Sequence, residues 1–232
     1  MSLSYALTET GHPEAAFKVL DAVPVQGERA DVLHMTAVLP LRKARGSEAA
    51  LAWLKQTFPT VPDDRGRHLA LLAFREGMPE LVWDAVPDPK GTDDYAQTTW
   101  MLRAAQVARQ GDSAPASRKQ ALREHYAAER QLSRHTQIGR YLIGELPEAE
   151  LAKLVTDLPG TCEVPYYFGV RALGEKRLRD AADWYRVAVE CGLRHEAEYL
   201  FAWNELYRLR GEKNIFALLR SSREREPGAA TR

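Results

Sequence analysis

Several features that would narrow the class of this protein are scarce or missing. Only two cysteines occur in 232 residues, too few for the disulfide framework of a small secreted domain. No apolar run approaches the roughly 20 residues that span a bilayer, and the N-terminus lacks the basic and apolar regions of a secretory signal. The 32 basic and 32 acidic residues leave no net charge, whereas a domain that neutralises phosphates is normally basic. These absences predict a cytoplasmic protein with no membrane span and no nucleic-acid partner.

Motifs for catalysis and metal binding are missing too. None of the six histidines belongs to a zinc helix or a nucleophile elbow, and no glycine-rich loop for phosphate is present. Cys191 and His195 have the spacing of two ligands on one helix, but no second pair accompanies them. We therefore expect no catalytic residue, no metal and no cofactor, and interpret Cys162 and Cys191 as packing residues. If the chain is exported, a disulfide between them would join the start of one helix to the end of its partner.

Helical periodicity is present along most of the chain, and alternating β-branched runs are absent, so we predict an all-α fold. The clearest segment is 163–192. Phe168 and Leu173 lie on one face of a first helix, and Leu178 begins the apolar face of a second. Gly192 is placed to end the second helix, because glycine adopts the left-handed conformation at little cost.

Small and large residues alternate in this segment where two helices must approach closely. The pattern resembles the tetratricopeptide repeat, a helix pair of about 34 residues. Phe168 and Gly169 stand at that family's Leu-Gly pair. Its aromatic-or-apolar, Ala, aromatic and Ala positions are matched by Leu178, Ala181, Tyr185 and Ala188.

Weaker repeats occur elsewhere. The segments from Gly11 and Gly77 both run from Gly-x-Pro-Glu into an apolar helix that ends in Asp-Ala-Val-Pro, and the segment from Gly144 has a similar outline. Expected helix starts lie near 3, 28, 64, 94, 133, 163 and 195, about 25 to 40 residues apart. With the resemblance, this predicts a right-handed α-α superhelix of about seven antiparallel helix pairs. We expect one domain at 1–222, a hinge near 88–93 and a disordered tail at 223–232.

The resemblance implies that the first helix of each pair lines a concave groove, which holds an extended peptide or a partner helix. The leading hypothesis is a non-catalytic scaffold or adaptor of a bacterial assembly, of undetermined oligomeric state. Arginine and aromatic residues at the mapped positions suit a peptide with acidic and apolar side chains. The groove candidates are Arg67, Leu71, Arg75, Tyr166, Val170, Leu173, Phe201, Glu205 and Arg208.

Tryptophan recurs about once per predicted helix pair. Most of the tryptophans should be wedges in the core, and one or two on an exposed face would anchor a partner. The five positions are Trp53, Trp83, Trp100, Trp184 and Trp203.

Two other functions stay open. The C-terminal part is similar to helical-repeat adaptor lipoproteins of bacterial envelopes, although it has no lipobox. The chain opens inside a helical pattern, with Leu3, Ala6 and Leu7 already periodic, as a fragment would. It would then be the repeat segment of a larger envelope or exopolysaccharide-secretion protein, in the periplasm. The third hypothesis is an enzyme on an α-solenoid framework, whose charged site would contain His125, Glu129 and His135.

A basic stretch runs along the middle of the chain and would suit an acidic partner or RNA. Glu124 and Glu129 interrupt it, so we interpret it as a solvated charged face. Its members are Arg118, Lys119, Arg123, Arg130, Arg134 and Arg140.

Overall fold

The computed structural model of the chain is helical, and it contains no strand in the part that it describes. The described residues are 93–194 and 196–210, together with 6–8, 10–22, 40–46, 81–84 and isolated positions between 37 and 91. The predicted all-α class is confirmed for these residues. The chain divides into two compact units, Met1–Thr99 and Trp100–Arg232. The predicted tail at 223–232 lies outside the described residues.

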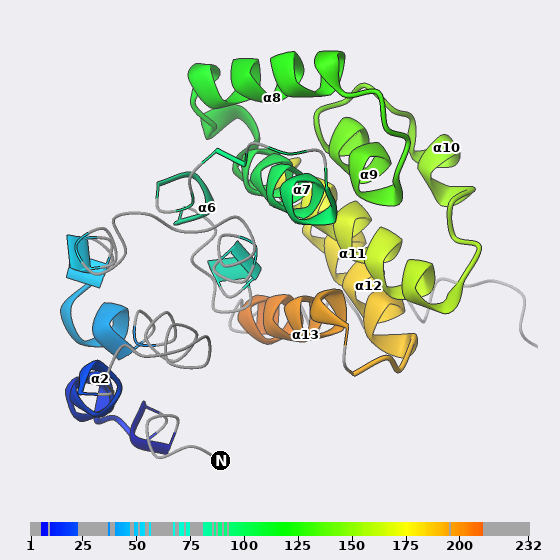
Figure 1. Cartoon of the computed structure of the whole chain (residues 1–232). Helices are drawn as coiled ribbons and strands as arrows, with labels where there is room; N and C mark the ends of the chain where they lie inside the picture. Colours follow the sequence, from blue (N-terminus) through cyan, green and yellow to red (C-terminus); the bar gives the residue numbers. More distant parts are fainter. Residues whose placement is uncertain are drawn as a thin grey trace, which may run out of the picture. The chain divides into compact units, whose positions relative to one another are not determined.

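The N-terminal unit contains α2 (Pro13–Asp21) and α6 (Leu81–Asp84) (Figure 1). Proline begins α2, where its missing N–H leaves no hydrogen bond unmade. Phe17 is buried on the inner face of α2, and the Arg45 guanidinium lies 5.4 Å from the centre of its ring. Arg45 also pairs with Glu14, so α2 is tied to the helical segment at 40–45.

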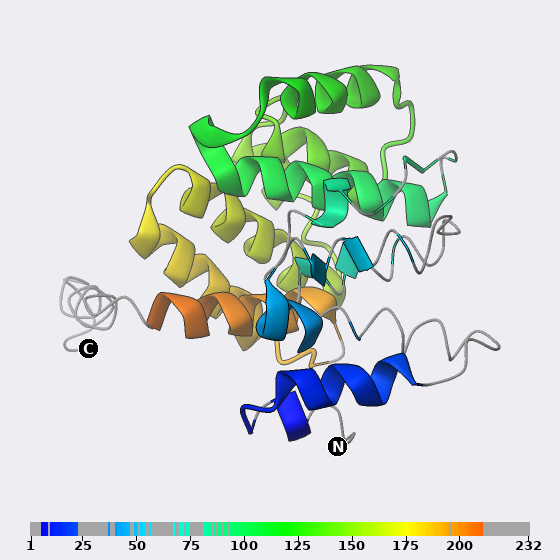
Figure 2. The same ribbon diagram turned by 90° about the vertical axis from the view of Figure 1, so that its left-hand side faces the viewer.

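The C-terminal unit is built from consecutive helices that lie beside one another, from α8 in bright green to α13 in orange (Figure 2). The boundary between the two units falls inside α7, the helix predicted to begin near residue 94. The elements are α7 (Asp94–Gln110), η1 (Gly111–Ser113), α8 (Ala116–Ala128), α9 (Arg134–Leu142), α10 (Glu148–Ala152), α11 (Leu158–Gly174), α12 (Leu178–Glu190) and α13 (Ala197–Arg210).

The hairpin of α11 and α12 confirms the small-and-large pattern read from the sequence. A Cβ atom on Gly169 would lie 2.5 Å from Cε1 of Tyr185, so only glycine lets the two helices approach this closely. Ala181 and Ala188 of α12 are fully buried. Leu178 was expected in the core but is exposed, because it is the first residue of α12 and follows a solvated turn.

Helix α11 begins at Leu158, five residues before the start predicted near 163. The Asp157 side chain caps it by accepting a hydrogen bond of 2.8 Å from the Gly160 N–H. Pro165 lies inside the helix, where proline costs about 3 kcal/mol. Three buried aromatic side chains follow it, and their burial offsets this cost. They are Tyr166, Tyr167 and Phe168.

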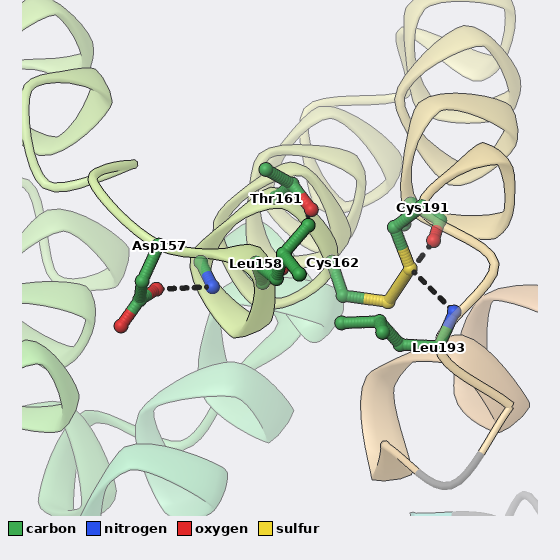
Figure 3. The surroundings of a disulfide bond; sticks show 8 residues. Asp157, Leu158, Thr161, Cys162, Cys191 and Leu193 are labelled. Carbon is green, nitrogen blue, oxygen red and sulfur yellow. Dashed lines mark hydrogen bonds between the residues drawn. A yellow bond between two sulfur atoms is a disulfide. The ribbon is translucent and has the colours of Figure 1, made fainter.

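Cys162 and Cys191 form a disulfide between α11 and α12, with their Cα atoms 5.5 Å apart (Figure 3). Cys162 lies in the second turn of α11, and Cys191 follows the last residue of α12. The bridge therefore joins the start of one helix to the end of its partner, the arrangement expected for an exported chain. The interpretation of both residues as packing residues alone is corrected, because antiparallel helices bring these two ends together.

Part of the internal repeat is visible as a shared turn. Gly11 and Gly144 both have a positive φ, of +84° and +85°. A proline at or before the first residue of a helix follows each of them, Pro13 for α2 and Pro147 for α10. Of the third predicted copy, from Gly77, the structure describes the apolar helix α6 (Leu81–Asp84), whereas the glycine and proline that precede it lie outside the described residues.

We predict that Gly169→Ala lowers the free energy of unfolding by about 1–3 kcal/mol, because the added methyl group meets the Tyr185 ring. Alanine forms helices better than glycine does, so a loss of stability would come from the clash with Tyr185 and not from helix propensity. Urea unfolding monitored by circular dichroism measures the change. Gly91→Ala is the control, since its Cβ would meet only Asp93, at 3.6 Å. An unchanged or raised stability for Gly169→Ala would contradict the packing argument.

Candidate functional site

A cleft opens in the C-terminal unit where α7, α9 and α11 end. It consists of two pockets of about 270 and 310 Å³, which share Gly144, Arg171 and Glu175. These volumes are at the small end for ligand sites, which are typically about 300–1,000 Å³. The cleft therefore has room for one or two side chains of a larger partner.

Backbone atoms form one wall of this cleft. A Cβ atom on Gly111 would lie 2.5 Å from the carbonyl oxygen of Gly174, and one on Gly174 would lie 1.8 Å from the carbonyl oxygen of Ala108. Gly111 also has a φ of +56°, which favours glycine. The ends of α7 and α11 thus touch through their main chains, and a side chain at either glycine would push them apart.

Arg171 is held rigidly at the centre of the cleft. Its Nη1 donates a hydrogen bond of 3.0 Å to the carbonyl oxygen of Tyr141, and its Nε donates one of 2.9 Å to Glu175. The guanidinium also lies 4.8 Å from the centre of the Tyr141 ring. Three interactions fix this arginine, so it presents the same surface to any ligand.

The two pockets differ in charge. Lys119 and Arg123 of α8 line the first, one helical turn apart, and neither side chain has an ion-pair partner among the described residues. Glu145 and Glu148 line the second, which also contains Arg177, and Arg177 is paired with Glu175 and Asp180. The cleft is therefore basic at one end and acidic at the other.

A second polar cluster lies at the opposite end of α11, with Glu163 and Glu198 buried and Asp157 exposed at its edge. Arg134 of α9 bridges Asp157 and Glu163 at 2.7 and 2.5 Å, and the His135 Nε2 lies 3.2 Å from Glu163. The Tyr167 hydroxyl donates a hydrogen bond of 3.0 Å to Glu198 of α13. Burial, and next the negative charge of Glu163, raise the pKa of Glu198 to about 7.

The groove candidates occupy different surroundings. Tyr166, Val170, Phe201 and Glu205 are buried. The rings of Tyr166 and Phe201 lie 5.5 Å apart, and Glu205 pairs with Arg109 of α7 and with Arg208. These four side chains pack between helices, and the peptide-binding role of the whole set stays a prediction. The half-buried members are Arg67, Leu71, Leu173 and Arg208, and Arg75 lies outside the described residues.

The exposed face of α13 includes an apolar stripe that the groove assignment missed. Leu200, Trp203 and Tyr207 are 38%, 50% and 75% exposed, and their spacing of three and four residues places them on one side of the helix. Among the five tryptophans, Trp203 is exposed and the others are half-buried. The sequence did contain a signal for this stripe. Helix α13 has apolar residues on both sides, and only one side can face the core.

Of the three residues suggested for an enzyme site, His125 and Glu129 lie one helical turn apart and interact electrostatically, whereas His135 has different surroundings. The His125 ring stacks on Trp100 with their centres 4.2 Å apart, and burial lowers the pKa of this histidine. Glu129 accepts a hydrogen bond of 2.7 Å from the Gln131 N–H, whereas His135 is next to Glu163. Within the described ranges, no group of three histidine, cysteine or acidic side chains is placed to hold a metal ion.

Comparison of the chain with models of known protein families, with curated proteins and with solved structures finds no match. In the described part of the chain, every helix is too short or too polar to cross a membrane.

We predict that Glu198→Gln raises stability above neutral pH. The pKa of Glu198 is higher in the folded chain than the ordinary value of about 4.3. The folded state therefore binds the proton more tightly, and stability falls as the pH rises from about 4 to 7. The variant should be more stable at pH 8 by about 1–3 kcal/mol.

Urea unfolding between pH 4.5 and 8 checks this, with Glu190→Gln, an exposed glutamate of α12, as the control. Parallel pH profiles for Glu198→Gln and the unaltered chain would refute the assignment of the raised pKa to Glu198.

Proposed function

We propose that this protein is a non-catalytic scaffold or adaptor that binds another protein, and that it is a tetratricopeptide-like right-handed superhelix of about seven helix pairs. The observation that supports binding is the apolar stripe of α13. Two large aromatic side chains, Trp203 and Tyr207, lie exposed one turn apart, next to Leu200.

Aromatic residues of this kind are the usual anchors of protein interfaces. Tryptophan and tyrosine are enriched among residues that dominate binding energy, because they bury a large rigid surface and offer one polar group. Single exposed apolar residues are common on any protein, but a contiguous patch marks an interaction surface. The stripe fits the apolar face of a partner helix, which would lie along α13.

The stripe also differs from the residues first assigned to binding. Phe201 and Glu205 lie on the same helix but on its buried side, where they pack against α11 and α7. A partner can therefore reach Trp203 and Tyr207 without opening the core. We propose these two residues as the main anchors.

Affinity capture from a native lysate, with quantitative mass spectrometry, tests the proposal. The Trp203→Ala/Tyr207→Ala variant should capture at least about tenfold less partner than the unaltered chain, because it removes both anchors of the stripe. Leu132→Ala, which removes an exposed leucine from the loop before α9, is the control and should capture the partner normally. If the double variant is folded by circular dichroism and captures the same proteins, the proposed role of α13 is wrong.

The disulfide favours a second candidate function, a repeat segment of a larger exported envelope or exopolysaccharide-secretion protein. Disulfides persist in oxidising compartments such as the periplasm and are rare in the cytosol. Cys162 and Cys191 are bonded to each other, and no other cysteine occurs in the chain. In this case, the protein would act as the same kind of scaffold, but outside the cytoplasm.

We predict that reduction of the disulfide lowers the free energy of unfolding. The bond closes a loop with a sequence separation of 29, and cross-links of this span contribute about 2–4 kcal/mol by restricting the unfolded chain. Urea unfolding with and without dithiothreitol measures the loss, and Cys162→Ser/Cys191→Ser should show no response to the reductant.

Alkylation of the protein in its native cells separates the two candidate functions. Unreactive cysteines support export, and modified cysteines support a cytoplasmic scaffold.

A further inference from the structure

We propose that the cleft at the ends of α7, α9 and α11 binds an extended peptide segment with acidic side chains, whose carboxylates pair with Lys119 and Arg123. The inference rests on the proposed function, because it assumes that the chain binds other proteins. It adds a separate site and a class of ligand.

The first step concerns the cations. Arg171 is already paired with Glu175 and bonded to the Tyr141 carbonyl, whereas Lys119 and Arg123 have no acidic partner in the described part of the chain. The helix ends nearby carry partial negative charge, but N–H groups already cap them. The Gly144 N–H donates to the Tyr141 carbonyl, and the Lys176 N–H to the Leu173 carbonyl. The two cations therefore remain available to a ligand.

The second step concerns the shape of the ligand. Val107 and Leu142 form a buried apolar wall beside the two cations, and such a wall favours a side chain over a hydrated inorganic anion. The adjoining pocket carries Glu145 and Glu148, which accept hydrogen bonds. A peptide matches the cations, the apolar wall and these carboxylates, since it has acidic side chains, apolar side chains and backbone N–H donors.

Fluorescence anisotropy with labelled synthetic peptides tests the proposal on the full chain. The probe is a ten-residue peptide of alternating glutamate and leucine, and the comparison probe is its lysine and leucine counterpart. The acidic probe should bind to the unaltered chain. The Lys119→Glu/Arg123→Glu variant should raise the Kd of this probe at least about tenfold, because two attractive contacts become repulsive. Arg130→Glu/Arg179→Glu changes the net charge equally without altering the cleft, and should leave the Kd within about twofold.

Three results would overturn the proposal. The first is no binding of the acidic probe at 1 mM, roughly the weakest affinity expected of a specific site. The second is equal binding of the lysine probe, or an equal loss in both double variants, which would indicate unspecific attraction. The third is complete displacement by inorganic phosphate, which would make the cleft a small-anion site. Trp203→Ala/Tyr207→Ala should bind the probe normally, so failure of the cleft and failure of the α13 surface are distinguishable.

Discussion

The close contact between α11 and α12 is the constraint on which the C-terminal unit depends. It exists because Gly169 has no side chain at the point where the Tyr185 ring packs. The ring of Tyr166 then lies 5.7 Å from that of Tyr185 and 5.5 Å from that of Phe201, so one aromatic layer joins α11, α12 and α13. Aromatic groups bury large areas in such layers, which makes this the main apolar contribution to the unit.

Both candidate surfaces are consequences of this packing. Helix α13 uses Phe201 to reach the aromatic layer, and the opposite side of the same helix then presents Trp203 and Tyr207. Helix α11 ends at Gly174 against the main chain of Ala108, and this contact forms a wall of the cleft. A wider separation of the helices would alter both surfaces together.

Buried charges define which helix packs against which. Glu205 of α13 pairs with Arg109 of α7, and Arg134 of α9 pairs with Glu163 of α11. Such pairs add little net stability, since removing the charges from water is costly. A misplaced helix, however, would leave one of these charges buried without its partner. The pairs therefore favour one arrangement of helices over others. They also give these buried glutamates a structural role.

The sequence by itself determined the helical class, the starts of α7 and α13 to within a few residues, and the small residues of the α11–α12 hairpin. These are local properties, because periodicity, caps and side-chain size are readable along one segment. Only the tertiary structure decided which side of each helix is covered. Helix α11 has apolar residues on every side, so its pattern could not show that Tyr166 and Val170 face the core. The bond between Cys162 and Cys191, and the cleft where three helices end, arise from segments far apart in the chain, and their proximity is fixed by packing.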